Sequence, residues 1–207
     1  MLSSPVSAET AVDPELTQWP RRGAVTVFDL EYTAWPGSRA RRWSEPWEHR
    51  EVIQIGAVRL DAGAGFAVLE SFAGLVRPER NPRLSDYITD LTGITDAMIV
   101  AEGIAFAEAL ARFTDFAQGP VMTFGGDGEV LRENCALAGI DMPLTPWRVV
   151  NLGPALCRVL GADYAETTSG DLPSLAGIAP TGRRHDALAD ARAIAAVMAA
   201  LRAEAKI

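Results

Sequence analysis

Residues 24–33, AVTVFDLEYT, are the stretch that decides the fold of this chain. The small and β-branched residues that fill it predict a buried strand. Its far end carries two carboxylates, Asp29 and Glu31, one residue apart. Residues two positions apart on a strand point to the same face, so both carboxylates should aim at one spot. A divalent cation would relieve the repulsion between them, which predicts a hard-metal site. The alternative is that the pair only begins a polar loop.

The length and composition predict a globular protein. The chain has 207 residues, of which 48% are hydrophobic and 22% charged, which suits one domain with a sizeable core. Residues 1–22 are expected to be a flexible N-terminal segment, and residues 23–207 the folded domain. The opening segment lacks the basic start and apolar core of a signal peptide, and no apolar run reaches membrane-spanning length. We therefore expect a cytoplasmic protein without a membrane partner.

The charge and the cysteines narrow the class of protein further. A net charge of −8 argues against a protein that coats nucleic acid through a basic surface. It still allows an enzyme that holds a strand end through metal ions and a few arginines. The two cysteines, Cys135 and Cys157, lie in segments with helical patterning, and we expect them to be reduced core residues.

The order of predicted elements indicates a single α/β domain with a mixed sheet. Three strands come first, and their predicted ranges are 24–33, 52–60 and 66–76. Helical patterns follow: Ser85 and Thr95 are expected to cap two short helices, the first of which ends near Gly93. Further helices are predicted at 104–117, 129–138, 154–160 and 186–203. Two short strands, PVMTF (120–124) and WRVVNL (147–152), alternate with these helices.

Three more residues stand out as candidates for chemistry. Asp127 follows the PVMTF strand in a glycine-lined turn, where small neighbours allow a ligand to approach closely, although Gly-Gly-Asp-Gly is also ordinary turn chemistry. His185 and Asp190 are five residues apart at the start of the last helix, so both could face one pocket. The alternatives are a surface or capping histidine and a solvated aspartate. Asp186 is expected to be structural, because the helix dipole favours an acid there.

Together these residues form three motifs that resemble those of the DEDDh 3′–5′ exonucleases of the DnaQ-like superfamily. The motifs are Asp29-Leu30-Glu31, then Asp127 with Leu131 four residues later, then the segment HDALAD at 185–190. EVIQIGAV (51–58) also resembles the family's second strand, and ITDLTGIT (88–95) its substrate-side helix and turn. The resemblance extends from Val25 to Met198. It implies a ribonuclease H-like domain whose five-stranded sheet has three antiparallel and two parallel strands, flanked by helices.

The resemblance also implies an activity and a site. The expected enzyme is a metal-dependent 3′–5′ exonuclease that releases nucleoside 5′-monophosphates from RNA or DNA. Two Mg²⁺ or Mn²⁺ ions would be held by the four carboxylates Asp29, Glu31, Asp127 and Asp190. His185 would act as general base. The single-stranded 3′ end would contact a set of substrate-binding residues: Leu30, Glu31, Tyr32, Thr33, Leu91, Thr92, Ile94 and His185.

Within the superfamily, several segments resemble the Eri-type branch, which trims structured or double-stranded RNA ends. These segments are the long loop after Glu31, FGGDGEVLRENC (124–135) and WRVVNL. The branch often has Trp-Gly-Asp-x-Asp around its middle motif, whereas this chain has Phe-Gly-Gly-Asp at 124–127. In the loop at 34–50, arginines 39, 41 and 42 could meet phosphates, and Trp35 and Trp43 could stack on bases. The alternative is a solvated loop with its tryptophans packed on the domain.

Two other functions stay open at this point. One is a catalytically idle nucleic-acid-binding module on the same fold, against which stands the fact that every expected catalytic position is filled. The other is an oligoribonuclease-like enzyme for very short substrates. No motif distinguishes RNA from DNA, because that choice depends on contacts to the 2′-hydroxyl. Nor does any segment decide between a monomer and a homodimer.

Overall fold

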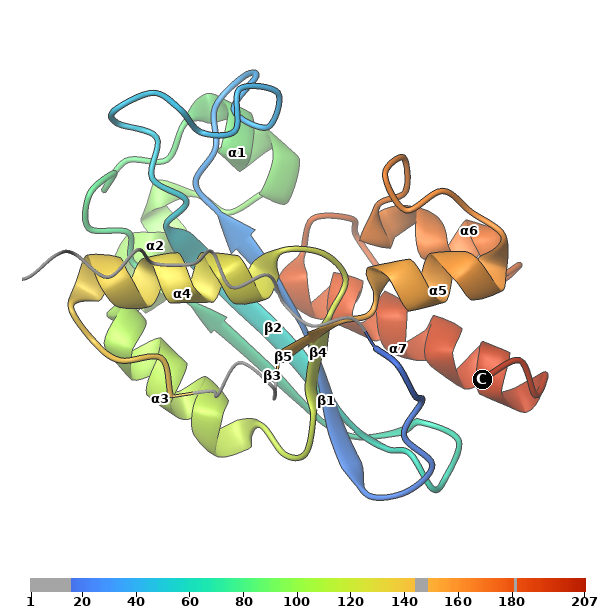
Figure 1. Ribbon diagram of the computed structural model, residues 1–207. Coiled ribbons are helices and arrows are strands. Elements are labelled where there is room, and N and C mark those ends of the chain that lie inside the picture. Colours follow the sequence, from blue (N-terminus) through green and yellow to red (C-terminus); the bar gives the residue numbers. More distant parts are fainter. Residues whose placement is uncertain (1–15, 144–148, 181) are drawn as a thin grey trace, which may run out of the picture.

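A five-stranded mixed sheet with the strand order β3-β2-β1-β4-β5 forms the centre of the molecule (Figure 1). The computed structural model describes residues 16–143, 149–180 and 182–207. The strands are β1 (Ala24–Tyr32), β2 (Val52–Asp61), β3 (Ala67–Leu75), β4 (Val121–Thr123) and β5 (Val149–Asn151). β1, β2 and β3 pair antiparallel, whereas β4 pairs parallel with both β1 and β5. This confirms the predicted mixed sheet.

Helices cover both faces of the sheet (Figure 1). One face packs against α7 (Ala187–Ala203), with α5 (Gly153–Leu160), the 3₁₀ turn η2 (Ser169–Asp171) and α6 (Leu172–Leu175) beside it. The other face packs against α3 (Phe106–Phe116) and α4 (Asp127–Ala138). A third, smaller core under α1 (Asp86–Thr92) and α2 (Asp96–Glu102) includes Ile53 of β2. Residues of β1 contribute to the cores on both faces of the sheet.

The central strand β1 is apolar on both faces and becomes acidic at one end of one face. Val25 and Val27 pack in the core that α7 covers, whereas Phe28 and Leu30 pack in the core that α3 covers. Because side chains alternate along a strand, Asp29 and Glu31 continue the row of Val25 and Val27. The two carboxylates thus share one face of the strand, as the sequence pattern predicted, and this face is the one that α7 covers.

The helix ends follow their capping residues. The Ser85 hydroxyl accepts a hydrogen bond from Ile88 N at 3.1 Å, and α1 ends at Gly93, whose φ of 75° suits glycine. The Thr95 hydroxyl accepts from Met98 N at 3.3 Å and begins α2. The predicted caps are therefore confirmed.

Two predictions need correction or restriction. α4 begins at Asp127, not at Glu129, so Asp127 belongs to the first turn of a helix and not to a loop. The predicted flexible segment at 1–22 lies largely outside the described residues, and so do positions 147 and 148 of the predicted last strand. Within the described part, Leu16 and Trp19 pack against the core under α7. The domain boundary at residue 23 stays a prediction.

Three further observations concern the class of protein. Cys135 and Cys157 are buried and free, as predicted. In the part of the chain that the structure describes, none of the helices has the length and apolar character needed to cross a membrane. The cytoplasmic location and the choice between monomer and homodimer stay predictions.

Candidate active site

Five predicted site residues meet in one cleft of about 590 Å³ at the end of β1. They come from three elements that are distant in the sequence: Asp29 and Glu31 from β1, Asp127 from α4, and His185 and Asp190 from the start of α7. All four carboxylic acids are buried, with 7–8% of each residue exposed. The fold therefore gathers four acids and one imidazole in a place that water reaches only from the cleft side.

The two acids on β1 are strongly perturbed. Burial raises the pKa of Asp29 well above its usual value, and the charges of Asp127, Glu31 and Asp190 raise it further. Burial, followed by the charges of Asp190 and Asp127, raises the pKa of Glu31 to about 8. Among the described residues, neither carboxylate has a basic side chain within ion-pair distance. The two carboxyl groups thus have no counter-charge among the described residues, and a bound cation would favour their ionised forms.

Asp127 is positioned by the helix that it begins. Gly126 occupies the N-cap position of α4, so Asp127 lies in the first turn, where the helix dipole favours an anion. The fully buried Thr123, the last residue of β4, donates a hydrogen bond from its hydroxyl to Asp127 Oδ2. Strand β4 and helix α4 together fix the direction of this carboxylate.

The start of α7 holds His185 and Asp190 together. His185 lies just outside the helix in the left-handed region, with φ of 60°, and its backbone N donates to Asp190 Oδ2 at 3.0 Å. Burial raises the pKa of Asp190 to about 6, while this hydrogen bond and the Arg184 charge act in the opposite direction. Burial, followed by the Arg184 and Arg183 charges, lowers the pKa of His185. The imidazole is therefore neutral near pH 7 and able to accept a proton.

Asp186 has the structural role that its position predicted. Its carboxylate caps α7 by accepting from Ala189 N at 2.9 Å. It also accepts from Gln54 Nε2 at 3.2 Å, and Gln54 Oε1 in turn accepts from Ala187 N at 2.9 Å. Gln54 of β2 is the register partner of Glu31. One side chain on the neighbouring strand thus ties the start of α7 to the acidic end of β1.

Gly56 of β2 allows the close approach of α7 to the sheet. A Cβ atom at this position would lie 2.1 Å from Leu188 N and 2.2 Å from the Ala187 carbonyl carbon. Gly56 pairs in register with Asp29, so the helix start touches the sheet directly beside the first site carboxylate. Sequence reasoning missed the roles of Gln54 and Gly56, because each depends on a contact with residues more than 130 positions away.

The donor groups are suitable for a metal ion. One ligand atom each of Glu31, His185 and Asp190 lie within 4.8 Å of one another. Asp29 and Asp127 face the same cleft, and the charge of Asp127 raises the pKa of Asp29. Carboxylate oxygens are the ligands that Mg²⁺ and Mn²⁺ prefer. The residues present therefore fit hard divalent cations.

The predicted substrate-binding residues divide into two groups. Leu30, Glu31, Tyr32, Leu91 and His185 line the cleft. Thr33, Thr92 and Ile94 are buried and do not line it. The Thr33 hydroxyl bonds the backbone of the 34–50 loop, and the Thr92 hydroxyl bonds the α1 backbone. The second group therefore supports the walls of the cleft without reaching into it.

The cleft has a second wall that the sequence did not predict. Phe124 and Tyr164 lie edge to face with their ring centroids 5.6 Å apart, and Asn151 Nδ2 donates to Tyr164 Oη at 2.8 Å. Thr167, Thr168, Ser169 and Arg184 complete this wall. The segment has no regular pattern and lies between the motifs, so no signal in the sequence marked it.

The 34–50 loop is more ordered than a solvated loop. Its Arg41 forms an ion pair with the buried Glu48, whose carboxylate also accepts from the Ser38 hydroxyl at 2.6 Å. Trp43 Nε1 donates to the Thr33 carbonyl at 3.2 Å, and its ring lies 5.7 Å from that of Tyr32. Arg41 is thus engaged within the loop, whereas Trp35 and Arg39 line the cleft beside Trp43.

Comparison with known proteins places the chain in a family. The family model described as exonuclease (RNase_T) matches residues 26–198. The chain therefore belongs to this exonuclease family.

Individual relatives are similar to different extents. Over 87 residues the chain is 33% identical to mouse ERI1 exoribonuclease 2, a match that covers 42% of this chain and 12% of that protein. Among solved structures, the nuclease domain of 3′hExo bound to rAMP, described as a DEDDh family member, has a TM-score of 0.76 at 22% identity, covering 88% of this chain and 93% of that one. A complex of Escherichia coli exonuclease I with single-stranded DNA has a TM-score of 0.65 at 18% identity, covering 88% and 41%. These likenesses confirm the ribonuclease H-like nuclease fold.

Proposed function

We propose that this chain is a divalent-metal-dependent 3′–5′ exonuclease that releases nucleoside 5′-monophosphates from RNA or DNA. One observation carries the proposal: four buried carboxylates and a neutral imidazole, from three separate elements, meet in a cleft open to solvent. The family membership supports an exonuclease, and the names of the similar proteins support a nucleic-acid substrate.

Asp29, Glu31, Asp127 and Asp190 would hold two divalent cations. When bound, such cations activate water and stabilise the charge on the phosphate and on the leaving oxygen. Four ionised carboxylates and two divalent cations sum to zero charge, so a polyanion can approach this acidic chain. A ring nitrogen of His185 accepts the proton of the attacking water, and the lowered pKa of His185 keeps that nitrogen unprotonated at neutral pH.

The cleft walls suit a single terminal nucleotide. A volume of about 590 Å³ falls within the range of small-molecule sites. On one side lie the apolar Leu91 and Ile88 of α1, and on the other lie the aromatic rings of Phe124 and Tyr164. We propose that the base of the 3′-terminal nucleotide packs between these walls. The remaining strand then leaves the cleft past Arg39 of the 34–50 loop.

Labelled oligonucleotides test the proposal directly. RNA and DNA oligomers of one sequence, single-stranded and in duplexes, are incubated with the protein and Mg²⁺, Mn²⁺ or EDTA. A 5′ label should appear in a ladder that shortens stepwise, whereas a 3′ label should be released at once as a mononucleotide. EDTA should stop both reactions. The reverse labelling pattern would refute the polarity, and internal cuts would refute an exonuclease.

Variants test the site. His185→Ala and Asp29→Asn should each lower the rate by about a hundredfold or more, since removing a general base or a metal ligand removes a main source of catalysis. Asp115→Asn is the matched control, because Asp115 is exposed on α3, which covers the other face of the sheet. Rates on dinucleotides and on longer strands separate this function from an oligoribonuclease-like one. Binding without turnover with every metal would instead support an idle module.

A further inference from the structure

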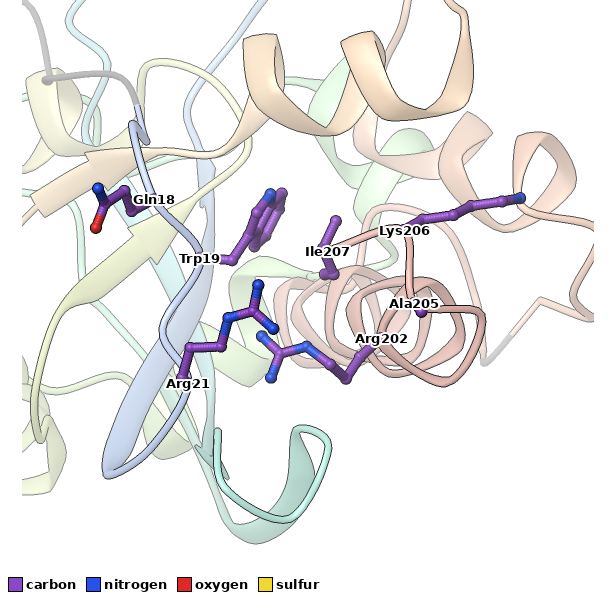
Figure 2. Close-up of a pocket in the computed structure, with 7 residues that line it drawn as sticks. All are labelled: Gln18, Trp19, Arg21, Arg202, Ala205, Lys206 and Ile207. Atoms are coloured by element: carbon purple, nitrogen blue, oxygen red, sulfur yellow. The ribbon is translucent and has the colours of Figure 1, made fainter.

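A second cavity, of about 550 Å³, lies at the opposite end of α7 from the acidic cleft. Its lining comes from the chain just before β1 and from the last residues of the chain (Figure 2): Gln18, Trp19, Arg21, Arg202, Ala205, Lys206 and Ile207. Asp190 of the acidic cleft and Arg202 are twelve residues apart on α7, which is about 18 Å along the helix axis. The cavity is therefore separate from the candidate active site.

The charged side chains that line this cavity are of one sign. Arg21 and Arg202 extend their guanidinium groups toward the same space below Trp19 (Figure 2). In the described ranges, no carboxylate lies within ion-pair distance of either arginine, whereas Lys206 pairs with Glu204 at 2.6 Å. The chain as a whole has a net charge of −8. Two arginines that face one another without an acid, on so acidic a protein, form a place for an anion.

Arg202 is held firmly in its position. Its Nη2 donates to the Pro20 carbonyl at 2.7 Å and its Nη1 to the Ala62 carbonyl at 3.4 Å. The guanidinium carbon lies 4.4 Å from the centroid of the Phe66 ring. Its buried Nε has no hydrogen-bond partner among the described residues, and both burial and the Arg21 charge lower the pKa of Arg202. An anion between the two guanidinium groups would offset the repulsion between Arg21 and Arg202.

We propose that this cavity binds the phosphate group of a small ligand between Arg21 and Arg202, with Trp19 as the apolar wall beside the group that carries the phosphate. Guanidinium groups suit this role because their planar array of N–H donors matches phosphate oxygens. The volume accommodates a ligand up to the size of a mononucleotide. Free phosphate and a nucleoside monophosphate share this chemistry, and the experiment distinguishes them.

The test uses the full chain in EDTA, with inorganic phosphate and adenosine 5′-monophosphate as separate probes. Without divalent metal no cation links an anion to the carboxylates of the acidic cleft, so binding reports on the second cavity. Titration calorimetry gives the affinity, and the indole N–H signal of Trp19, assigned with Trp19→Phe, reports the place of binding. Sodium chloride at equal ionic strength controls for general salt effects.

Arg21→Ala is the main variant, because Arg21 is exposed and makes no hydrogen bond that holds the described fold. We expect it to weaken phosphate binding about tenfold or more, as for the loss of a hydrogen bond to a charged group. Arg22→Ala is the matched control: it removes the same charge from the next residue, which does not line the cavity. It should change the affinity by no more than about twofold, since only the screened general charge is lost.

The outcomes are decisive in either direction. Saturable shifts of the Trp19 signal that Arg21→Ala removes and Arg22→Ala retains uphold the site. Tighter binding of the nucleotide than of phosphate identifies a nucleotide as the ligand, and equal affinities identify phosphate alone. The proposal is overturned if sodium chloride reproduces the shifts or if Arg21→Ala binds phosphate as the wild type does. No step of this test depends on nuclease activity, so it succeeds or fails independently of the proposed function.

Discussion

Replacing Glu31 with glutamine should stabilise the metal-free protein, and the gain should grow with pH. The folded protein raises the pKa of Glu31 from 4.5 to about 8, chiefly because the side chain is buried. Between these two values the folded state keeps the proton that the unfolded state releases. Raising the pH therefore favours the unfolded state. The free energy of unfolding that the protonated group contributes falls as the pH rises from 4.5 to about 8. Glutamine has the shape of the protonated acid and cannot release a proton.

The magnitude follows from this pKa difference. Each pH unit between the two pKa values costs the wild type about 1.36 kcal/mol relative to the variant. From 4.5 to pH 7 the difference in free energy of unfolding should reach about 3 kcal/mol. This difference should be close to zero at pH 4.5. Saturating Mg²⁺ or Mn²⁺ should reverse the order, because the wild type gains a metal ligand that glutamine supplies poorly.

Urea unfolding in EDTA, followed by circular dichroism, measures the difference at several pH values. The useful range runs from about pH 5.5 to 7.5, which stays above the isoelectric point near 4.8. Across these two pH units the difference in free energy of unfolding between variant and wild type should grow by ~3 kcal/mol. Glu102→Gln, at an exposed position at the end of α2, controls for the general loss of a negative charge. A difference that does not change with pH, or a variant less stable than the wild type in EDTA, would refute the reasoning.

Three other substitutions test how the site is supported. Gly56→Ala should lower the free energy of unfolding by about 3 kcal/mol, because the added Cβ would meet the α7 backbone at 2.1 Å. Urea unfolding measures this loss, and an unchanged midpoint would contradict the close contact between α7 and β2. Gln54→Leu removes both hydrogen bonds to the start of α7 and should lower the exonuclease rate about tenfold, measured on labelled RNA with the fold checked by circular dichroism. Thr123→Val removes the hydroxyl that orients Asp127 and should weaken Mn²⁺ binding about tenfold by calorimetry; unchanged affinity would mean that Asp127 needs no such support.

The parts of the fold that local chemistry determines could be predicted from the sequence. The alternation along β1 predicted that Asp29 and Glu31 share a face, and Ser85, Gly93 and Thr95 marked the ends of two helices. In each case the determining interaction spans only a few residues. The sequence placed the start of α4 two residues too late, because local glycines were given too much weight. Glycines at 125, 126 and 128 indicated a turn, but Gly126 only caps a helix that Asp127 begins.

The parts that depend on distant contacts could not be predicted. Gln54 read only as a polar residue within a strand, yet it bonds the start of α7 from 132 positions away. Tyr164 gave no signal, because its place in the cleft follows from packing on Phe124 and from the Asn151 amide. The resemblance to a family pointed to four carboxylates, which the structure brings together in one cleft, and to Thr33, Thr92 and Ile94, whose side chains do not line it. These three positions are occupied by packed side chains, since a motif shows which segment is near a site and not which side chains reach it.

The four carboxylates are not equivalent, and the elements that carry them explain why. Asp127 and Asp190 each lie in the first turn of a helix, where the helix dipole favours an anion. Asp190 also accepts from His185 N, and its pKa rises only to about 6. Asp29 and Glu31 lie on a strand, which offers no such dipole, and the pKa of Glu31 rises to about 8. Asp29 and Glu31 therefore depend most on bound cations for their ionised forms. Asp127 and Asp190 depend on them less, because the helix dipole already favours their negative charge.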